Sequence, residues 1–308
     1  MTIALTGGTG FVGRAVLDEA ARKGLATKAL TRRDPPGVTG CEWVRGDLGD
    51  RTALAELADG AAAFLHIAGL TKARDDRAFA EINVLGTQTV LEAAKVAGVQ
   101  RFVFVSSLSA REPDLSAYGR SKAEAEMLVE ASGMDCVIVR PPAVFGPRDT
   151  EMLDLFRAAK RGVVPLPPPG RVSLIEVSDL AKLLLTLCQS DDVANEDVHD
   201  CATYEPDDGA SAGYSHRELA GMIAASVGRD SVFAPHMPRR VLSLAGRMDV
   251  LLRRDKARLT RDRAAYMAHP DWVADPALRP PASLWEPQVT AREGLVDTAR
   301  WYTREGWL

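Results

Sequence analysis

Tyr118 and Lys122 are the residues of this sequence best suited to moving a proton. The run Tyr118-Gly-Arg-Ser-Lys122 places a phenol and an ammonium four residues apart, which on a helix is one face. A neighbouring ammonium stabilises a phenolate, so a group whose ordinary pKa is about 10 can exchange a proton near neutral pH. Tyrosine and lysine at this spacing are also common on exposed helix surfaces, so the pattern gains weight only beside other features.

Two serines supply one such feature. The apolar run over 101–106 predicts a buried strand, and it ends in Ser106 and Ser107. A hydroxyl at the carboxyl end of a strand can hold a substrate oxygen; Ser107 is the first choice and Ser106 the reserve. Ser107, Tyr118 and Lys122 together predict general acid–base catalysis at an oxygen atom, which contributes typically ~10²- to 10⁴-fold.

A glycine-rich turn supplies the other. The spacing GxxGxxG stands between the strand predicted over 2–6 and the helix predicted over 12–23. Glycine allows the tight turn and lets a pyrophosphate approach bare backbone at the positive end of the helix. The residues expected to bind a nicotinamide dinucleotide here are Gly7, Gly10, Phe11, Val12 and Gly13.

The end of the second predicted strand bears on the choice between NAD and NADP. It reads Ala29-Leu30-Thr31-Arg32-Arg33, and Asp34 comes only after the two arginines. A strand-end carboxylate would hold the ribose 2'-hydroxyl of NAD, whereas an arginine accepts the 2'-phosphate of NADP. NADP(H) is therefore favoured through Arg32. The alternative is that an arginine only stacks on the adenine and that NAD(H) binds as well.

The predicted elements form an α/β fold. Short apolar runs over 2–6, 27–31, 62–67, 101–106 and 135–140 alternate with helical patterns over 12–23, 51–58, 77–97 and 121–131. This alternation is typical of a doubly wound parallel Rossmann sheet. A proline-rich stretch follows Arg140. Beyond it we expect a strand over 171–177, a helix over 180–189 with Asp179 as N-cap, and a strand over 197–202, both strands returning to the sheet.

The C-terminal part predicts a smaller, mainly helical substrate lobe. From Ser215 helical patterns recur, beginning with a capping box of Ser215 and Glu218. The expected organisation is a dinucleotide-binding domain over 1–145 and roughly 171–205, with a substrate lobe over roughly 146–170 and 206–308.

Bulk properties exclude several function classes. The 308 residues are 46% hydrophobic and 26% charged, as in ordinary globular proteins, and the net charge of −4 gives no reason to expect nucleic acid as a partner. The four cysteines form no metal or disulfide pattern, so we interpret them as thiols in a reducing compartment. With no signal segment and no apolar run near 20 residues, the expected location is the cytoplasm.

The sequence resembles the extended branch of the short-chain dehydrogenase/reductase superfamily, which contains epimerases, dehydratases and reductases. Besides the glycine turn and YxxxK, the resemblance covers almost the whole chain through the motifs Gly46-Asp47-Leu48, His66-Ile67-Ala68-Gly69, Asn83 in Ile82 to Thr87, Arg140-Pro141, Phe145-Gly146-Pro147 and Val177-Ser178-Asp179-Leu180. It implies an NAD(P)-dependent enzyme without a metal and, in many members, a homodimer formed through the helices over 77–97 and 121–131.

The resemblance also implies roles for individual residues. Asp47 and Leu48 would lie beside the adenine, and Ala68 against the dinucleotide. Lys122 would bind the nicotinamide ribose, with Tyr118 beside it, and Pro141 and Val144 would border the nicotinamide. From the residues alone, Asp47 could equally be the N-cap of the helix near Arg51. A structural role is favoured for His66 and Asn83.

Two departures from the family narrow the expected substrate. Nucleotide-sugar epimerases usually follow the strand-end arginine with an aromatic residue and an asparagine, whereas this chain has Pro141 and Pro142 there. Proline offers no amide side chain, so a nucleotide sugar is disfavoured. Tyr118 follows Ser107 by only 11 residues, as in atypical members that hold NADPH without turnover. Retention of Ser107, Tyr118 and Lys122 favours a working enzyme.

The leading hypothesis is an NADP(H)-dependent oxidoreductase that interconverts a secondary alcohol and a ketone on a small or hydrophobic substrate. The alternatives are an NAD(P)-dependent epimerase or dehydratase and a non-catalytic NADPH-binding scaffold or redox-sensing subunit.

A basic segment stands apart from this picture. Residues 239–263 hold nine cations against three aspartates, and the stretch over 241–252 is amphipathic. It suits a membrane surface, an anionic substrate tail or a partner, although the favoured interpretation is a helix with a solvated basic face and its apolar face on the lobe.

Overall fold

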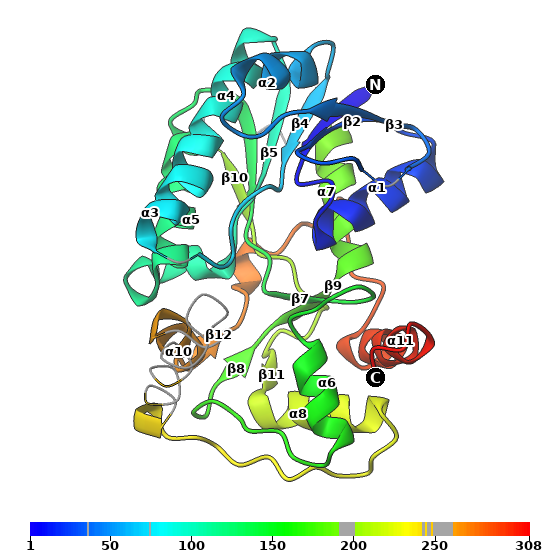
Figure 1. The fold of residues 1–308 in the computed structure, drawn as a ribbon, viewed down its shortest axis with the longest axis vertical. Coiled ribbons are helices and arrows are strands. Elements are labelled where there is room, and N and C mark those ends of the chain that lie inside the picture. The colour runs from blue at the N-terminus through cyan, green and yellow to red at the C-terminus, as the bar shows by residue number, and fades with distance from the viewer. Residues whose placement is uncertain (36, 74, 191–200, 242–243, 245–247, 249–260) are drawn as a thin grey trace. The chain divides into compact units, whose positions relative to one another are not determined.

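A seven-stranded parallel sheet forms the centre of the first of two compact units (Figure 1). The strands are β1 (Thr2–Thr6), β2 (Ala26–Thr31), β3 (Cys41–Arg45), β4 (Ala63–His66), β5 (Arg101–Val105), β6 (Asp135–Val139) and β10 (Ala202–Tyr204). Their order is β10-β6-β5-β4-β1-β2-β3. The direction of winding reverses between β1 and β4, and ligands of such sheets bind at the carboxyl ends of the strands beside that reversal. The Rossmann prediction is confirmed.

The computed structural model describes residues 1–35, 37–73, 75–190, 201–241, 244, 248 and 261–308. The first unit contains Met1–Pro141, Ser178–Glu205 and Pro280–Glu286, and the second contains Pro142–Val177, Pro206–Arg279 and Pro287–Leu308. The first unit thus ends at 141 and resumes at 178, where the sequence suggested 145 and 171.

Helices cover both faces of the large sheet (Figure 1). One face carries α1 (Phe11–Lys23) and α7 (Val177–Gln189), and the other carries α2 (Arg51–Ala58), α4 (Gly86–Val96) and α5 (Ala117–Glu130). A core of apolar side chains lies between the sheet and the helices α2, α4 and α5, among them Leu54, Phe64, Val90, Phe102 and Ile138. This burial holds the strand ends in place and with them the loops that follow.

The helix predicted over 77–97 has three parts. α3 (Asp76–Phe79) leads into a π-helical turn over Ala80–Leu85, and α4 continues from Gly86. Such wide turns are frequently found at functional sites, and this one contains Asn83.

Two expectations about α7 and its neighbours are wrong. The helix begins at Val177, so Asp179 lies in its first turn and pairs with Lys182 at 2.9 Å, and it is not the N-cap. The strand expected over 171–177 is split into β8 (Arg171–Val172) and β9 (Leu174–Glu176), and neither joins the large sheet. The strand expected over 197–202 lies mostly outside the described residues, and β10 begins at Ala202.

The second unit has two small sheets and several helices. β8 pairs with β11 (Tyr214–Ser215) and β12 (Asp271–Trp272), and β9 pairs with β7 (Ala143–Phe145). The helices described in it are α6 (Leu153–Lys160), α8 (His216–Ser226), α10 (Arg261–Met267) and α11 (Ala291–Arg304). The predicted capping box of Ser215 and Glu218 starts α8. The core of the unit is formed by large side chains, among them Phe145, Phe156, Ile223, Leu295 and Tyr302.

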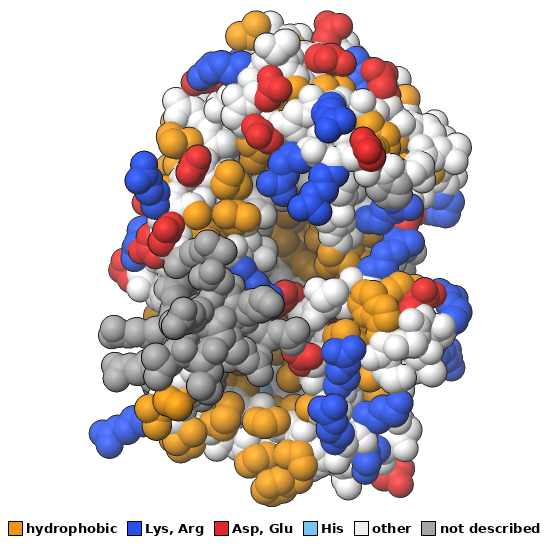
Figure 2. Space-filling view, in the orientation of Figure 1, with side chains coloured by type: hydrophobic (Ala, Val, Ile, Leu, Met, Phe, Trp, Pro, Cys, Tyr) orange, Lys and Arg blue, Asp and Glu red, His pale blue; other side chains and the backbone are white. Residues whose placement is uncertain are grey.

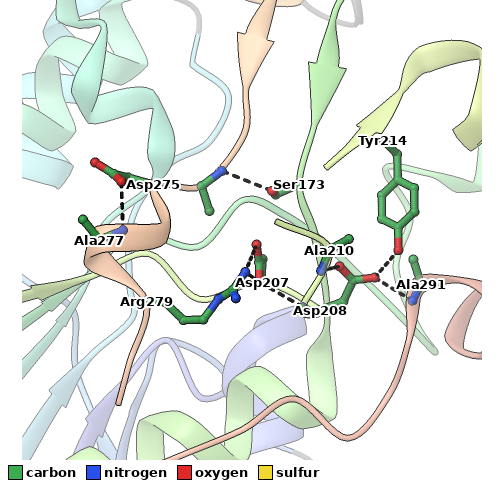
Figure 3. Close-up of polar contacts among 11 residues, drawn as sticks. Ser173, Asp207, Asp208, Ala210, Tyr214, Asp275, Ala277, Arg279 and Ala291 are labelled. Carbon is green, nitrogen blue, oxygen red and sulfur yellow. Dashed lines mark hydrogen bonds and ion pairs between the residues drawn. The ribbon is translucent and has the colours of Figure 1, made fainter. Parts of the chain in front are cut away.

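Buried carboxylates join the segments of the second unit (Figure 3). Asp207 accepts two hydrogen bonds from Arg279, at 2.9 and 3.1 Å. Asp208 accepts one from the Tyr214 hydroxyl at 2.7 Å and one from the Ala291 amide at the start of α11, at 2.8 Å. Both carboxylates are over nine-tenths buried, so these bonds compensate the loss of hydration. Burial, as the largest cause, still raises the pKa of Asp207.

The expectation that no cysteines are paired is wrong for one pair. Cys136 and Cys201 form a disulfide with their Cα atoms 4.9 Å apart. Cys136 lies on β6, and Cys201 immediately precedes β10, whose Ala202 is in register with Val137. The two are 65 residues apart in sequence, so only the strand pairing brings them together.

Candidate functional site

The turn after β1 meets the turn after β4 at the reversal point of the sheet. Gly7 has a φ of +78°, and a Cβ there would lie 2.8 Å from the Ala68 amide nitrogen. The Thr6 hydroxyl at the end of β1 accepts a hydrogen bond from that same amide at 3.2 Å. Only glycine therefore fits at position 7, and Ala68 is fixed beside the glycine turn as the dinucleotide prediction requires.

The amino end of α1 is built for close approach to a phosphate. The helix begins at Phe11, and its N-cap Gly10 brings no side chain to bond the first amides. A Cβ on Gly13 would collide with the Gly7 carbonyl, so the helix packs directly on the turn. The amides of Phe11, Val12 and Gly13 thus remain available to an anion at the positive end of the helix. These residues fit a dinucleotide pyrophosphate.

The turn after β2 presents two arginines. The Thr31 hydroxyl donates to the Arg33 carbonyl at 2.6 Å and accepts from the Arg33 amide at 3.3 Å, which fixes the backbone of the turn. Arg32 is exposed, and no ion pair engages it among the residues that the structure describes. Asp34 is held 3.6 Å from Arg45. The Arg32 guanidinium is thus exposed just beyond the carboxyl end of β2.

Asp47 and Leu48 follow β3. Asp47 is exposed and accepts from the Gly49 amide at 2.9 Å, while the N-cap of α2 is Asp50, which accepts from the Ala53 amide at 3.0 Å. The N-cap reading of Asp47 is therefore wrong. Leu48 is buried against Gly86, the first residue of α4.

Lys122 is buried on α5 with 4% of its surface exposed. Its ammonium donates to the Val105 carbonyl at 2.7 Å and lies 4.4 Å from the centre of the Phe104 ring. Burial lowers its pKa to about 8, against the opposing charge of Glu126. A lysine ammonium has three N–H groups, and the Val105 carbonyl takes one. The remaining two suit the ribose hydroxyls that the resemblance assigns to this residue.

Tyr118 and Ser107 lie on elements that contact each other. Tyr118 is in the first turn of α5, and its ring lies 6.0 Å from that of Phe79. Ser107 caps the 3-10 turn over Leu108–Arg111, where its Oγ accepts from the Ser109 amide and donates to the Ser109 hydroxyl. That turn packs on α5 at Gly119, where a Cβ would lie 2.5 Å from the Ser109 carbonyl. Both side chains are half-buried.

Ser106, the reserve residue, has a different environment. The residue is 4% exposed, and within the described residues its Oγ has no hydrogen-bond partner. Ser107 is the more accessible of the two residues.

His66 lies at the centre of a buried hydrogen-bond chain. Its Nδ1 is 2.6 Å from the Thr6 hydroxyl, and its Nε2 is 3.0 Å from the Thr87 hydroxyl. The Thr87 proton is donated to the Asn83 carbonyl, so Thr87 must accept from Nε2–H. Nε2 therefore carries a proton, and Nδ1 of the neutral ring would accept a hydrogen bond from the Thr6 hydroxyl. Burial and, secondly, the charge of Lys122 lower the pKa of His66 to about 3.

Asn83 joins the turn after β4 to α5. Its carbonyl oxygen accepts from the Leu70 amide at 2.7 Å, and its amide group donates to the Leu70 carbonyl and to the Ser121 hydroxyl. Ser121 in turn donates to the Tyr118 carbonyl. The residue thus positions the helix that carries Tyr118 and Lys122, in line with the structural role favoured for it.

Sequence reasoning missed an ionic network behind α5. Arg140 binds both oxygens of Glu126, at 2.9 and 2.7 Å, and its guanidinium lies 3.6 Å from the fully buried Glu205. Arg111, from the turn after Ser107, binds Glu205 at 3.1 Å. Glu126 follows Lys122 by four residues, and this spacing is the one sequence signal that pointed to it. The network holds the Ser107 turn, α5 and the ends of β6 and β10 together.

The two residues expected to border the nicotinamide, Pro141 and Val144, belong to different units. Pro141 is buried in the first unit, and its carbonyl accepts from the Leu108 amide at 3.2 Å. Val144 lies on β7 of the second unit. The described residues contain no group of three His, Cys, Asp or Glu side chains that could hold a metal ion.

Curated relatives match this chain over nearly its full length. It is 36% identical to a ceramide reductase of Caulobacter vibrioides over 314 residues, covering 99% of this chain and 96% of the relative. It is 29% identical to a 2-alkyl-3-oxoalkanoate reductase of Stenotrophomonas maltophilia, covering 96% and 97%.

Solved structures share the fold. A structure of MoeE5 in complex with UDP-glucuronic acid and NAD has a TM-score of 0.72 at 23% identity, covering 99% of both chains. The model of the NAD dependent epimerase/dehydratase family matches residues 3–199, which contain the glycine turn, Ser107, Tyr118 and Lys122. The chain therefore belongs to the NAD dependent epimerase/dehydratase family and is an NAD(P)-dependent enzyme.

Proposed function

We propose that this enzyme is an NADP(H)-dependent reductase that converts a ketone on an apolar substrate into a secondary alcohol. The observation that carries the proposal is the environment of Lys122, a buried ammonium held against the Val105 carbonyl two residues before Ser107 and one helical turn from Tyr118. Two relatives that match over almost the whole chain are named as reductases.

Each residue has a separate task in this reaction. The amides of the glycine turn hold the pyrophosphate, and Lys122 orients the nicotinamide ribose through the two N–H groups that the Val105 carbonyl leaves free. When bound, the reduced nicotinamide supplies a hydride. The Ser107 hydroxyl turns its proton from Ser109 to the substrate oxygen, and Tyr118 transfers its phenolic proton to that oxygen. The Lys122 ammonium stabilises the phenolate that remains.

The second unit is the proposed substrate lobe, and a ceramide-related lipid ketone is the first substrate to test. The relative with the higher identity is named for ceramide, and Pro142 removes the amide side chain that nucleotide-sugar enzymes use. An epimerase or dehydratase remains the second candidate, because the matching family model covers both activities. Turnover without net loss of NADPH would favour that candidate, since its cofactor is restored in each cycle.

Arg32 supports the choice of NADP(H). A guanidinium beside a 2'-phosphate forms charge-assisted hydrogen bonds worth roughly 1.5–3 kcal/mol, which corresponds to about a tenfold to hundredfold preference. Calorimetric titration is expected to show tighter binding of NADPH than of NADH. The difference between the two affinities is expected to be smaller in Arg32→Ala. Equal affinities in the wild type would contradict this assignment.

We further propose a homodimer. Leu85 and Met127 are 56% and 59% exposed, and they lie in the helical segments through which extended members pair. Light scattering is expected to give twice the chain mass of 33.2 kDa, and Met127→Glu is expected to give monomers. A wild-type monomer at micromolar concentration would refute the dimer.

A further inference from the structure

Large apolar side chains are exposed in two segments of the second unit. Phe233 is 68% exposed and Val163 45%, and Val241, Leu244 and Met248 are 49%, 61% and 46% exposed. Burial of one such side chain is worth roughly 1.5–3 kcal/mol, so leaving five in water is unfavourable unless something covers them. In Figure 2, apolar side chains gather along the lower margin of this unit, with Lys and Arg side chains on either side.

The backbone places Val163 and Phe233 side by side. They form a parallel bridge in which the Phe233 amide donates to the Gly162 carbonyl and the Val164 amide donates to the Phe233 carbonyl, both at 2.9 Å. The same pairing continues at Leu166, whose carbonyl accepts from the Met237 amide at 2.8 Å. The segment over 232–237 is thus fixed along 162–166, and the two exposed side chains form one apolar spot.

The other three apolar residues share a helix face. Val241, Leu244 and Met248 are helical, and their spacing of three and four residues places them on one side. All three are exposed, so at these positions the apolar face of the amphipathic stretch does not pack on the core of the unit. The remainder of the basic segment over 239–263 lies partly outside the described residues.

Cations flank both apolar groups along the chain. Arg229 donates to the Lys160 carbonyl at 2.7 Å, and its guanidinium lies against Gly162, next to Val163. Over 160–166 and 229–241 the acids are limited to Asp230. The exposed cations of these segments are Lys160, Arg161, Arg229, Arg239 and Arg240. The whole chain has a net charge of −4, so this concentration of positive charge is local.

We propose that these ten residues form a docking surface for an anionic lipid bilayer, which we call the apolar–basic surface. Apolar side chains separated by arginine and lysine match the boundary between acyl chains and phosphate headgroups. A protein partner is disfavoured, because protein interfaces have a contiguous apolar core that is depleted of charge. The proposal goes beyond the proposed reaction, since docking requires neither Tyr118 nor Lys122. It would bring the enzyme to a substrate dissolved in the bilayer.

Flotation with vesicles tests this surface. The full-length protein is expected to float with vesicles that contain phosphatidylglycerol, more weakly with pure phosphatidylcholine, and less as salt concentration rises. The double variant Phe233→Ser/Leu244→Ser is expected to lower the partition coefficient at least tenfold. Arg161→Gln/Arg240→Gln is expected to remove the preference for anionic vesicles.

Matched controls keep the test specific. Val96 is 90% exposed on α4 of the first unit, and Val96→Ser is expected to bind vesicles like the wild type. Tyr118→Phe is also expected to bind vesicles normally, so docking and catalysis can fail separately. Every variant should keep its affinity for NADPH. Wild-type protein that does not float with anionic vesicles, or a Phe233→Ser/Leu244→Ser variant that floats as well as wild type, would overturn the proposal.

Discussion

Replacement of Lys122 by methionine is expected to make the protein without cofactor more stable near pH 7 while removing its activity. Lys122 is 4% exposed, and burial lowers its pKa from 10.5 to about 8. In the proposed reaction this buried charge binds the cofactor and stabilises a phenolate, which would account for its retention at a cost in folding free energy. Methionine has a similar length and can contact the Phe104 ring in place of the ammonium.

The magnitude follows from the pKa. Because one pKa unit corresponds to about 1.4 kcal/mol, the shift lowers the stability of the wild type at pH 7 by about 3 kcal/mol relative to a neutral lysine. The variant loses the charge-assisted hydrogen bond to the Val105 carbonyl, worth roughly 1.5–3 kcal/mol, so a gain of at most roughly 1.5 kcal/mol remains. Between pH 8 and 10.5 the unfolded chain binds more protons than the folded one, so wild-type stability rises there.

Urea unfolding followed by circular dichroism measures the difference. Lys122→Met is expected to be more stable than the wild type at pH 7. By about pH 10.5 the wild type is expected to be the more stable of the two. Lys160→Met, at an exposed position on α6, is the control and should change stability by less than about 0.5 kcal/mol. A Lys122→Met protein that is less stable at pH 7, by an amount that does not change with pH, would refute the reasoning.

Three further predictions concern the residues around the site. Burial lowers the pKa of His66 to about 3, so the free energy of unfolding of the wild type should fall as the pH is lowered from 6.5 to 3. This fall should be steeper than that of His66→Gln by up to about 1.4 kcal/mol per pH unit. Equal slopes of unfolding free energy against pH for the two proteins would contradict this. Glu126→Gln breaks the paired bonds to Arg140 and should cost about 3 kcal/mol in urea unfolding, whereas a loss below about 1 kcal/mol would show that the network is not structural. Gly13→Ala should abolish NADPH binding in calorimetry because the added Cβ meets the Gly7 carbonyl. The control is Gly221→Ala on α8, where the added Cβ has open space. This variant should bind NADPH normally and gain roughly 0.5–1 kcal/mol of stability. Normal NADPH affinity in Gly13→Ala would argue against the placement of the pyrophosphate.

Local patterns predicted the parts of the fold that depend on local sequence. The strand over 2–6 and the helix over 51–58 match the structure because apolar runs and helix periodicity are local signals. The N-cap of the helix over 51–58 shows where this prediction ends, because Asp47 and Asp50 are both suited to the role and only the backbone geometry selects Asp50. The exact ends of helices depend on such competition between neighbouring residues.

Long-range pairing explains the features that the sequence did not reveal. The bond between Cys136 and Cys201 requires that β10 lie beside β6, and the small sheets require that Arg171 meet residues more than 40 positions away. In the site, the spacing of Tyr118 and Lys122 was visible, but the burial of Lys122 and the role of Glu126 depend on strands β5 and β6. Residue types therefore indicated the chemistry, and packing determined its energetics.

The consumption of NADPH by a ketone substrate tests the central claim most directly. Purified wild-type protein is mixed with NADPH and a ceramide-related ketone, and the loss of NADPH absorbance is compared with the alcohol formed. We expect one NADPH consumed for each alcohol, with Tyr118→Phe slower by roughly 10²- to 10⁴-fold at unchanged NADPH affinity. Alcohol formed without Tyr118, or substrate converted without net loss of NADPH, would contradict the assignment of this site as a ketone reductase.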